Sequence, residues 1–262
     1  MITGLGFSEI LIIVAVVLMF FGSKELPRFI REIAGFLTKA RRYSDKLRRE
    51  IDDLSRPEPS TPTESPAMKK RKLRARYLET RKGLSEGDRR EKSERIWNNL
   101  RELEEFRTAG AVMVYVDIGS EVHTKRFIRG LREEGKRVVV PYCKIPTQEI
   151  GLAEIVDPET QLVPGAFGVP EPERSLRDNF FKSDLQLIIC PGVAFDRQGG
   201  RLGRGKHYYD SFLGELRGRV PIVGLAFAGQ IMDEQLPFEY HDVPMDEVVT
   251  EDGLIRKQSA EQ

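Results

Sequence analysis

The sequence has few cysteines and almost no net charge. Only 2 of its 262 residues are cysteine, Cys143 and Cys190, and they are far apart and show no metal-ligand spacing. Each ends an apolar run, which is typical of a buried thiol, so the pattern indicates a reducing compartment and argues against a disulfide framework. The 42 basic and 41 acidic residues leave a net charge of +1. This balance argues against a polyanionic partner for the whole molecule.

Long hydrophobic runs are also lacking, with one exception near the N-terminus. Residues 10–21, ILIIVAVVLMFF, carry no charge and are aliphatic or aromatic throughout. As a helix this run rises only about 18 Å, against a hydrocarbon core of roughly 30 Å, but counting from Ile2 provides enough length to span. No Lys or Arg precedes the run and no A-x-A site follows it, which argues against a cleaved signal peptide. We therefore predict a single transmembrane helix, with a buried helix of a soluble core as the alternative.

Basic residues follow this run and none precedes it. The positive-inside rule therefore predicts a single-pass protein of the cytoplasmic membrane, with the N-terminus outside and the rest in the cytoplasm. Apolar residues recur at spacings of three and four from Leu26 to Leu54. This stripe predicts a basic amphipathic helix, suited to an anionic membrane surface or to packing on a copy of itself. The basic residues are Lys24, Arg28, Arg31, Lys39, Arg41, Arg42, Lys46, Arg48 and Arg49.

The stretches GFSEILII and FGSKELP, followed by this basic helix, resemble the TatA/TatB subunits of the twin-arginine protein translocase. The resemblance covers residues 1–54. In that family a short membrane helix is followed, after a hinge at the FG pair, by an amphipathic helix on the cytoplasmic face. Glu9 and the Leu26-Pro27 pair are closer to the TatB type. The resemblance implies membrane lipid, copies of the same segment and translocase subunits as partners.

A linker at residues 55–66, SRPEPSTPTESP, separates this part from residues 67–262. Its prolines and hydroxyl residues keep it extended and cannot build a core. In residues 67–262 helical and strand patterns alternate, which predicts an α/β fold with a three-layer, mainly parallel sheet and helices on both faces. We expect two helices over 68–103, the second starting near Ser85, and further helices over 122–135 and 208–216. The expected strands cover 111–116, 136–142, 184–192 and 220–228.

A glycine-rich basic loop, RQGGRLGRGKHYYD, follows the strand expected at 184–192. Ligands of doubly wound sheets bind beyond the carboxyl ends of the strands, where this loop is expected. Its glycines at 199, 200, 203 and 205 allow backbone N–H groups to approach a phosphate, and its Arg and Lys side chains supply charged donors. It has neither the Walker A nor the G-x-G-x-x-G pattern. By itself the loop is equally compatible with a phosphate site and with a basic surface turn.

PGVAFDRQGGRLGRGKHYYD, residues 191–210, is similar to the signature of the 5-formyltetrahydrofolate cyclo-ligases, also called methenyltetrahydrofolate synthetases. The resemblance spans nearly all of residues 67–262. It implies a layered α/β fold and the ATP-dependent, Mg²⁺-requiring closure of 5-formyltetrahydrofolate to 5,10-methenyltetrahydrofolate. In the implied reaction the formyl oxygen attacks the γ-phosphate, N10 closes the ring on the phosphorylated imidate, and phosphate leaves. The other matching segments are KRKLR (70–74), SEVHT (120–124), FGVPEP (167–172) and HDVPMDEVVTEDG (241–253).

The resemblance also implies roles for individual residues. Lys70 and Arg74 would bind the ATP phosphates, Glu121 would orient the pterin, and Val116 would line its pocket. His207 stands where the family usually has glycine, so we expect reduced rather than lost activity, and Cys143 stands where some members have an aromatic residue. The implied sets are catalytic residues Lys70, Arg74, Arg204 and Lys206; ATP-binding residues Lys70, Arg74, Arg201, Leu202, Gly203, Arg204, Gly205, Lys206, His207, Tyr208 and Tyr209; substrate-binding residues Val116, Glu121, Phe167, Arg204, Gly205, Lys206, His207 and Tyr208; and Mg²⁺ ligands Asp210 and Asp242.

The leading hypothesis is therefore a membrane-anchored cyclo-ligase, and two others stay open. In the alternative the N-terminal segment works as a translocase component and the C-terminal domain is inactive or a passenger. In the third, KKRKLRAR (69–76) binds nucleic acid, but acidic residues balance the basic ones and no aromatic stacking platform is evident, so we expect no nucleic-acid partner. The same stretch also fits a solvated helix face, and Asp210 and Asp242 also fit ordinary helix and turn acids. His123 and His241 lack Cys or His neighbours at ligand spacing, and we expect both to be non-catalytic.

Overall fold

The computed structural model describes residues 65–165, 168–205 and 208–256. They belong to one compact unit of the chain, Glu64–Gln262. None of the helices in these ranges is long and apolar enough to cross a bilayer. The predicted transmembrane helix, the amphipathic helix up to Leu54 and most of the linker lie outside the described residues.

The second helix begins where the sequence predicts, and the first begins two residues early, at Pro66 within the predicted linker. The Ser65 side chain accepts a hydrogen bond from Met68 N, and Pro66 occupies the first helical turn of α3. Ser85 accepts a hydrogen bond from Asp88 N at the start of α4, which confirms the predicted helix start near Ser85. The α-helices are α3 (Pro66–Lys82), α4 (Glu86–Arg101), α5 (Glu104–Thr108), α6 (Lys125–Glu133), α7 (Pro158–Gln161) and α8 (Tyr208–Leu216), with 3₁₀ turns η2 (Arg174–Leu176), η3 (Lys182–Asp184) and η4 (Ala228–Gln230).

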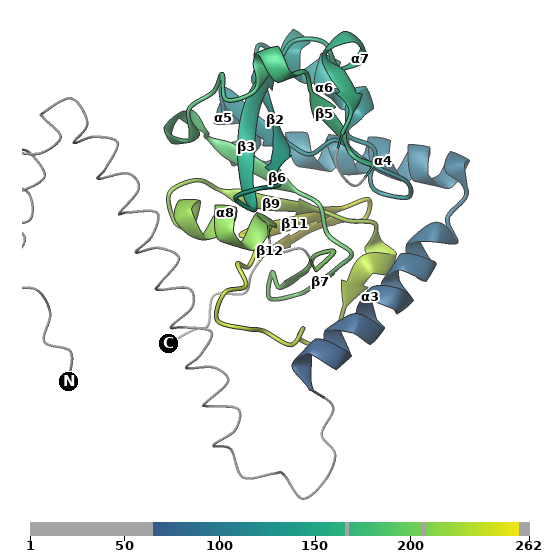
Figure 1. Cartoon of the computed structure of the whole chain (residues 1–262). Helices are drawn as coiled ribbons and strands as arrows, with labels where there is room; N and C mark the ends of the chain where they lie inside the picture. Colours follow the sequence, from purple (N-terminus) through teal and green to yellow (C-terminus); the bar gives the residue numbers. More distant parts are fainter. Residues whose placement is uncertain (1–64, 166–167, 206–207, 257–262) are drawn as a thin grey trace, which may run out of the picture. The chain divides into compact units, whose positions relative to one another are not determined.

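A seven-stranded sheet with the order β12-β11-β9-β6-β1-β2-β3 forms the centre of this domain (Figure 1). The four inner pairings are parallel. The two edge pairings, β2 with β3 and β11 with β12, are antiparallel. The prediction of a mainly parallel sheet is therefore confirmed. Its strands are β1 (Ala111–Val114), β2 (Arg137–Lys144), β3 (Glu149–Ile155), β6 (Leu187–Cys190), β9 (Ile222–Leu225), β11 (Glu247–Thr250) and β12 (Gly253–Arg256).

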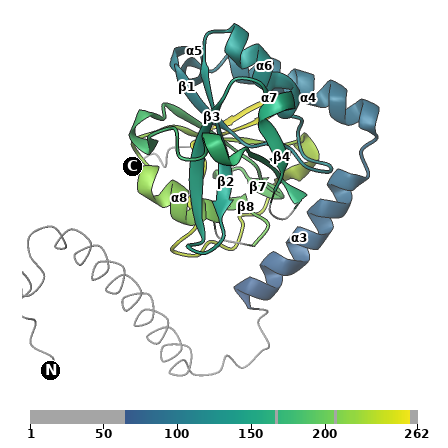
Figure 2. The ribbon, with the colours of Figure 1, turned by 45° about the horizontal axis from the view of Figure 1, so that its top comes forward.

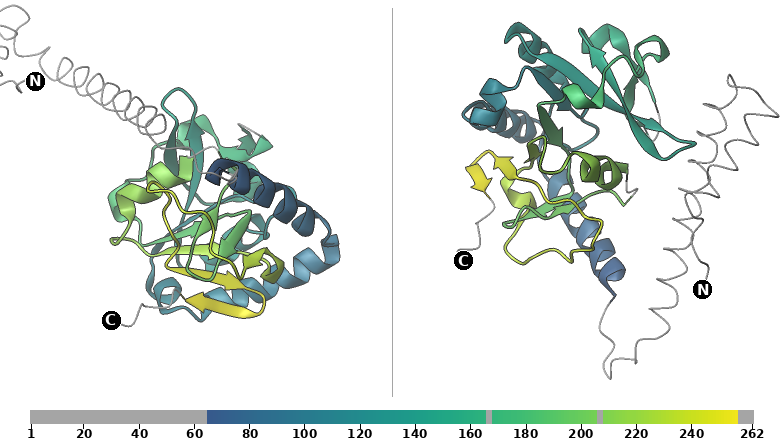
Figure 3. Two further views of the ribbon diagram at one scale, coloured as in Figure 1. Left: turned by 90° about the horizontal axis from the view of Figure 1, so that it is seen from below. Right: turned by 90° about the vertical axis from the view of Figure 1, so that its left-hand side faces the viewer.

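Helices cover both faces of this sheet, as predicted. Successive side chains of a strand point to opposite faces, and in β1 Val112 and Val114 join a core with α4, α5 and α6. Ala111 and Met113 join a second core with α8 on the other face. The views in Figure 3 show the same arrangement, with the β11–β12 hairpin in yellow at the edge of the sheet. The three layers thus follow because the strands are apolar on both faces, so that each face of the sheet packs against helices.

Two small sheets were not predicted from the sequence. One has the order β10-β7-β8 and packs against α3 through a third core that contains Tyr77, Leu202 and Met232. The other pairs β4 with β5. The β2–β3 hairpin, seen in Figure 2, was predicted only as the strand at 136–142. The strands of the small sheets are β4 (Leu162–Pro164), β5 (Pro170–Pro172), β7 (Ala194–Asp196), β8 (Arg201–Leu202) and β10 (Ile231–Met232).

The strand order places a topological switch point between β1 and β6. From β1 the chain passes through α6 to β2 on one side, whereas from β6 it passes through α8 to β9 and then β11 on the other side. The two strands are parallel neighbours, so the loops after their carboxyl ends lie next to each other. Ligands of such sheets bind at this position. The fold alone therefore directs attention to the loops that follow Val114 and Cys190.

Candidate active site

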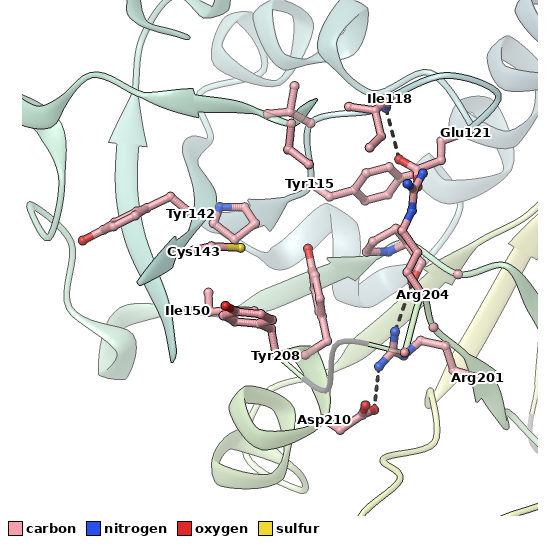
Figure 4. A pocket seen from close by; sticks show the side chains of 18 of the residues that line it. Tyr115, Ile118, Glu121, Tyr142, Cys143, Ile150, Arg201, Arg204, Tyr208 and Asp210 are labelled. Carbon is pink, nitrogen blue, oxygen red and sulfur yellow. Dashed lines mark hydrogen bonds and ion pairs between the residues drawn. The ribbon is translucent and has the colours of Figure 1, made fainter. Parts of the chain in front are cut away.

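A cavity of about 380 Å³ opens at this switch point (Figure 4). Its wall draws on the loops after β1 and β6, on β2, β3 and β5, on the glycine-rich loop and on the first turn of α8. Segments more than 90 residues apart in the sequence, such as Tyr115 and Tyr208, meet there. Pockets of this size hold small-molecule ligands when apolar walls carry a few convergent polar groups. Of the predicted site residues, this wall contains Val116, Glu121, Arg201, Gly203, Arg204, Gly205, Tyr208, Tyr209 and Asp210.

Aromatic and aliphatic side chains make up one part of the wall. Tyr115, Tyr142, Tyr208 and Ile150 line the cavity, and in the close view the Tyr142 ring points away from the other labelled side chains (Figure 4). Gly151 is the cross-strand partner of Tyr142, and a Cβ there would overlap the tyrosine ring, so glycine allows the ring to lie across the hairpin. Burial raises the pKa of Tyr115 well above its ordinary value of 10.0, so that phenol stays neutral. This part of the cavity suits a flat, largely apolar ring.

Glu121 is the one carboxylate held deep in the wall beside β1. It is 6% exposed, and its Oε2 accepts a hydrogen bond of 3.1 Å from Ile118 N. Its Oε1 accepts a hydrogen bond of 2.8 Å from Arg204 Nη2 (Figure 4). Arg81 Nη2 lies 4.0 Å from the same oxygen. A buried carboxylate needs such partners, and here two guanidinium groups supply the opposite charge.

The glycine-rich loop divides into a structural half and a half that faces the cavity. Asp196, 1% exposed, accepts hydrogen bonds from Gln198 N and Gly200 N at 2.9 and 2.7 Å and so forms the turn. Gly199 has φ +83°, and a Cβ there would meet the carbonyl of Met245. These two glycines are therefore required by the turn itself. Only the later glycines, 203 and 205, line the cavity.

Arg74 and Arg201 hold the cavity half of the loop from two sides. Arg74 Nε donates a 2.8 Å hydrogen bond to Gly203 O. Arg201 Nη2 donates a 2.6 Å hydrogen bond to Asp210 Oδ1, and the side chains of this pair are 4% and 17% exposed. The buried Arg201 Nε has no hydrogen-bond partner among the described residues. Arg201 thus places a positive charge on the cavity wall, where it can attract an anionic ligand.

Lys70 lies outside the cavity wall and binds two carboxylates instead. Its Nζ donates hydrogen bonds of 2.6 Å to Glu239 Oε2 and to Asp242 Oδ2. Burial alone would lower the pKa of Lys70, but these hydrogen bonds outweigh it, and the pKa is raised above its ordinary 10.5. Burial would likewise raise the pKa of Asp242, yet the hydrogen bonds from Lys70 and Glu239 N leave it below its ordinary 3.8. Both groups are therefore charged at neutral pH.

The segment Glu239–Asp242, whose two carboxylates bind Lys70, contains a group of possible metal ligands. One ligand atom each of Glu239, His241 and Asp242 lies within 4.8 Å of the others. Asp210, the other predicted Mg²⁺ ligand, is not a member of this group and lies on the cavity wall beside Arg201. Asp242 lies with Glu239, His241 and Lys70, and the predicted role of Asp210 and Asp242 as the two Mg²⁺ ligands stays a prediction.

Comparison with known proteins decides the family. The model of the 5-formyltetrahydrofolate cyclo-ligase family matches residues 66–251. The chain belongs to this family. The 5-formyltetrahydrofolate cyclo-ligase of Haemophilus influenzae is 29% identical over 70% of this chain and 97% of its own length. The mouse 5-formyltetrahydrofolate cyclo-ligase is 28% identical over 70% of this chain and 94% of its own length.

Solved structures of this family share the fold. The 5,10-methenyltetrahydrofolate synthetase of Aquifex aeolicus is 37% identical with a TM-score of 0.64, over 74% of this chain and 96% of the relative. The 5,10-methenyltetrahydrofolate synthetase of Mycoplasma pneumoniae is 24% identical with a TM-score of 0.55, over 70% of this chain and 98% of the relative. Both relatives consist almost entirely of the matching domain. In this chain the same domain belongs to one compact unit, Glu64–Gln262, so experiments on it can use residues 65–262.

The N-terminal segment matches a different family. A model described as the mttA/Hcf106 family matches residues 3–50. This match confirms the resemblance of residues 1–54 to TatA/TatB. It covers less than a fifth of the chain, so it identifies a segment that is joined to the cyclo-ligase domain.

The remaining predicted site residues of the cyclo-ligase domain are placed elsewhere or not described. Leu202 is buried with Tyr77 in the core between α3 and the small sheet, so its side chain does not face the cavity. Phe167, Lys206 and His207 lie outside the described residues, and their predicted roles stay predictions.

Three polar residues of the site were missed in the sequence. Arg81 lies 11 residues after Lys70 on the same face of α3, and this helical spacing was the available signal. Glu239 lies three residues before Asp242 in the segment EYHD. Glu171, 4% exposed on the cavity wall, accepts hydrogen bonds from Cys143 N and from Arg177 Nη2. In the segment FGVPEP the family resemblance implied a role for Phe167 but not for Glu171.

Proposed function

We propose that this protein converts 5-formyltetrahydrofolate to 5,10-methenyltetrahydrofolate with consumption of ATP, and that Mg²⁺ is required. The observation that carries the proposal is the composition of the cavity wall at the switch point. Tyrosine and aliphatic side chains there lie beside two buried carboxylates, Glu121 and Glu171, and two arginines, Arg201 and Arg204. A pterin offers a flat ring with N–H donors, and ATP offers anionic oxygens. Membership of the cyclo-ligase family supports the same reaction.

Glu121 is the residue proposed to orient the pterin. Its carboxylate accepts one bond from Ile118 N and one from Arg204, so both oxygens are directed by the chain before ligand binds. A carboxylate is an acceptor with about four lone-pair sites, and it can accept pterin N–H donors in addition. Tyr115 and Val116, which directly follow β1, would contact the ring from the same side. Ring binding in this wall would exclude water from the formyl group.

The arginines of the glycine-rich loop fit the phosphates of ATP. Arg201 Nε is a buried donor without an acceptor among the described residues, and Arg204 is 49% exposed and can turn toward a ligand. Arg74 would support the loop through Gly203 O, and the predicted contribution of Lys206 belongs to the same loop. ATP, as the second substrate, would supply the phosphoryl group that makes the formyl oxygen a leaving group for ring closure by N10. The chain's part in this transfer is to position and neutralise charge.

The acidic residues of the site fit Mg²⁺ by their chemistry. Magnesium prefers carboxylate oxygens and retains several waters, and Asp210 and Asp242 provide two carboxylates. One oxygen of each already accepts a hydrogen bond from a basic side chain, Arg201 or Lys70. Each carboxylate would therefore share its charge between that side chain and the ion. When bound, the ion would neutralise phosphate oxygens during transfer.

The reaction is tested on purified residues 65–262 with 5-formyltetrahydrofolate, ATP and Mg²⁺. We expect the absorbance of the methenyl product to increase, and omission of either ATP or Mg²⁺ to abolish the increase. Glu121→Gln is expected to reduce kcat/KM for the folate by about tenfold or more, since a charged acceptor is lost. Asp233→Asn is the matched control, because Asp233 is 87% exposed and pairs only with Arg197 at the surface. No product from a folded domain would contradict the proposal.

We further propose that the N-terminal segment anchors the enzyme to the cytoplasmic membrane, N-terminus outside, in contact with anionic lipid. The match of residues 3–50 to the mttA/Hcf106 family supports this. Full-length protein is expected in the membrane fraction and a chain that starts at residue 65 in the soluble fraction. Recovery of both in the soluble fraction would contradict the anchor.

The second candidate function, a translocase component with a passenger domain, rests on the same match. It predicts that the full-length chain restores export in a strain that lacks a TatB-type subunit. It also predicts that an Asp210→Asn variant without ligase activity restores export equally well. Failure of both chains to complement, at normal membrane levels, would leave the segment with an anchoring role alone.

A further inference from the structure

Arg81 is a buried arginine that the proposed reaction does not yet use. It lies near the end of α3, and its side chain is only 2% exposed. Arginine is almost never this buried without partners. Burial lowers the pKa of Arg81 from its ordinary 12.5, and the charge of Glu121 acts against that change. The position therefore has a cost that some specific contact must offset.

The contacts of Arg81 connect the two loops of the switch point. Its Nε donates a 3.0 Å hydrogen bond to Ser120 Oγ, in the loop after β1. Its Nη1 donates a 3.2 Å hydrogen bond to Gly192 O, in the loop after β6. Its Nη2 lies 4.0 Å from Glu121 Oε1. One planar guanidinium group thus spans the two loops and adds positive charge beside the carboxylate predicted to bind substrate.

Arg204 carries the second guanidinium group beside Glu121, and unlike Arg81 it is half-exposed and comes from a loop. Arg204 is 49% exposed and comes from the glycine-rich loop, next to Gly203 and Gly205. Its 2.8 Å hydrogen bond to Glu121 extends across the cavity wall (Figure 4). An anionic ligand in the cavity would compete for this arginine. If Arg204 left, Glu121 would be a buried carboxylate whose nearest remaining cation is Arg81.

We propose that Arg81 is a positioning residue that holds Glu121 in place while Arg204 exchanges Glu121 for an anionic group of the bound ligands. Arg81 acts through Glu121 and does not touch substrate; its bonds to Ser120 and Gly192 hold the guanidinium group beside that carboxylate. Arg204 in turn acts on the ligand directly. The role rests on the proposed function, since it assigns Glu121 to the folate. It predicts that the effect of replacing Arg81 on ligand binding depends on the Glu121 carboxylate. The effect of replacing Arg204 should be present with or without that carboxylate.

The test is a double-mutant cycle for binding of 5-formyltetrahydrofolate to residues 65–262, measured by calorimetry. We expect Arg81→Met to weaken binding by about 10-fold or more in the wild-type background and by less than about 2-fold in the Glu121→Gln background. Arg204→Met is expected to weaken binding of the folate with ATP in both backgrounds. Lys82→Met is the control from the same helix, because Lys82 is exposed and pairs only with Glu79. It should bind within about 2-fold of wild type.

A purely structural role predicts a different result. Arg81→Met would then weaken binding by the same factor with and without the Glu121 carboxylate, and this additive cycle would overturn the inference. Unchanged binding in Arg81→Met would also overturn it. If Arg81→Met does not fold, Arg81→Lys replaces it in the cycle, since lysine keeps the charge but has no planar fork to join both loops. Wild-type protein that binds folate without turnover would refute the proposed reaction and leave the cycle readable.

Discussion

Removal of the Asp210 charge should destabilise the protein in the absence of any metal. Asp210 accepts a 2.6 Å hydrogen bond from Arg201, and both side chains are largely buried. Two unit charges at this separation attract by about 6 kcal/mol at an effective dielectric constant of 20, before desolvation is subtracted. Asparagine keeps an oxygen acceptor but not the charge, and Arg201 would become a buried cation. We expect Asp210→Asn to lower the free energy of unfolding by about 2–3 kcal/mol.

Urea denaturation of residues 65–262 in excess EDTA measures this change. With a slope of about 2–3 kcal/mol per molar, the urea midpoint should fall by roughly 1 M. The surface pair of Arg197 and Asp233, at 59% and 87% exposure, provides the control. Asp233→Asn should change the free energy of unfolding by less than about 0.5 kcal/mol.

An unchanged or increased free energy of unfolding in Asp210→Asn would refute this prediction. If Asp210 served only to bind a metal, its carboxylate would be a cost in metal-free protein, and Asp210→Asn would leave stability unchanged or increase it. Such a result would refute the reasoning that Asp210 neutralises Arg201. Activity cannot separate these cases, because the variant is expected to lose activity in either one. Stability in EDTA can.

Three further predictions follow from pKa shifts and backbone geometry. The pKa of Asp242 is held below its ordinary 3.8, because its hydrogen bonds outweigh the effect of burial. The charged carboxylate therefore stabilises the fold above about pH 4, and this stabilisation is lost as pH falls through the lowered pKa. The difference in free energy of unfolding between wild type and Asp242→Asn should shrink between about pH 5 and pH 3. Burial raises the pKa of Cys190 to about 12 and also raises that of Cys143. A thiol reagent at neutral pH should therefore label the native protein slowly, at the cavity residue Cys143, and 5-formyltetrahydrofolate should slow the labelling further. Labelling that persists in Cys143→Ser would contradict this prediction. Gly199→Ala adds a clash with a backbone carbonyl to a φ of +83° and should destabilise by more than about 2 kcal/mol by urea denaturation, whereas Gly218→Ala, with φ +74° and open space, should cost about 1 kcal/mol.

The fold was predictable where strands are apolar throughout and turns carry strong signals. The residues of β1 and β6 are buried on both faces, and short apolar runs of this kind are typical of the inner strands of a parallel sheet. The cap at Ser85 was readable because hydroxyl and acidic residues at that spacing favour a helix start. The short strands of the β10-β7-β8 sheet were missed. They have two or three residues each, and only their packing against α3 makes them strands.

The site was predictable as a set of residues but not as a set of pairs. Glu121, Arg201 and Arg204 do line one cavity, as the family resemblance implied. The ion pair between Glu121 and Arg204 joins loops that are 83 residues apart in sequence, and no local pattern contains such a distance. The buried role of Arg81 was hidden because a basic residue in a basic helix looks solvated. Its spacing from Lys70 and Arg74, not its charge, distinguishes it.

That spacing gives α3 a fixed phase relative to the rest of the domain. Lys70, Arg74 and Arg81 lie within about 40° of one another around the helix axis. A single residue inserted within the helix would rotate everything before it by about 100° and separate these three side chains. The described helix begins at Pro66 with its cap at Ser65, so its phase sets no such constraint on residues before the cap. An insertion ahead of the Ser65 cap would therefore leave Lys70, Arg74 and Arg81 on one face, whereas an insertion between Lys70 and Arg81 would not.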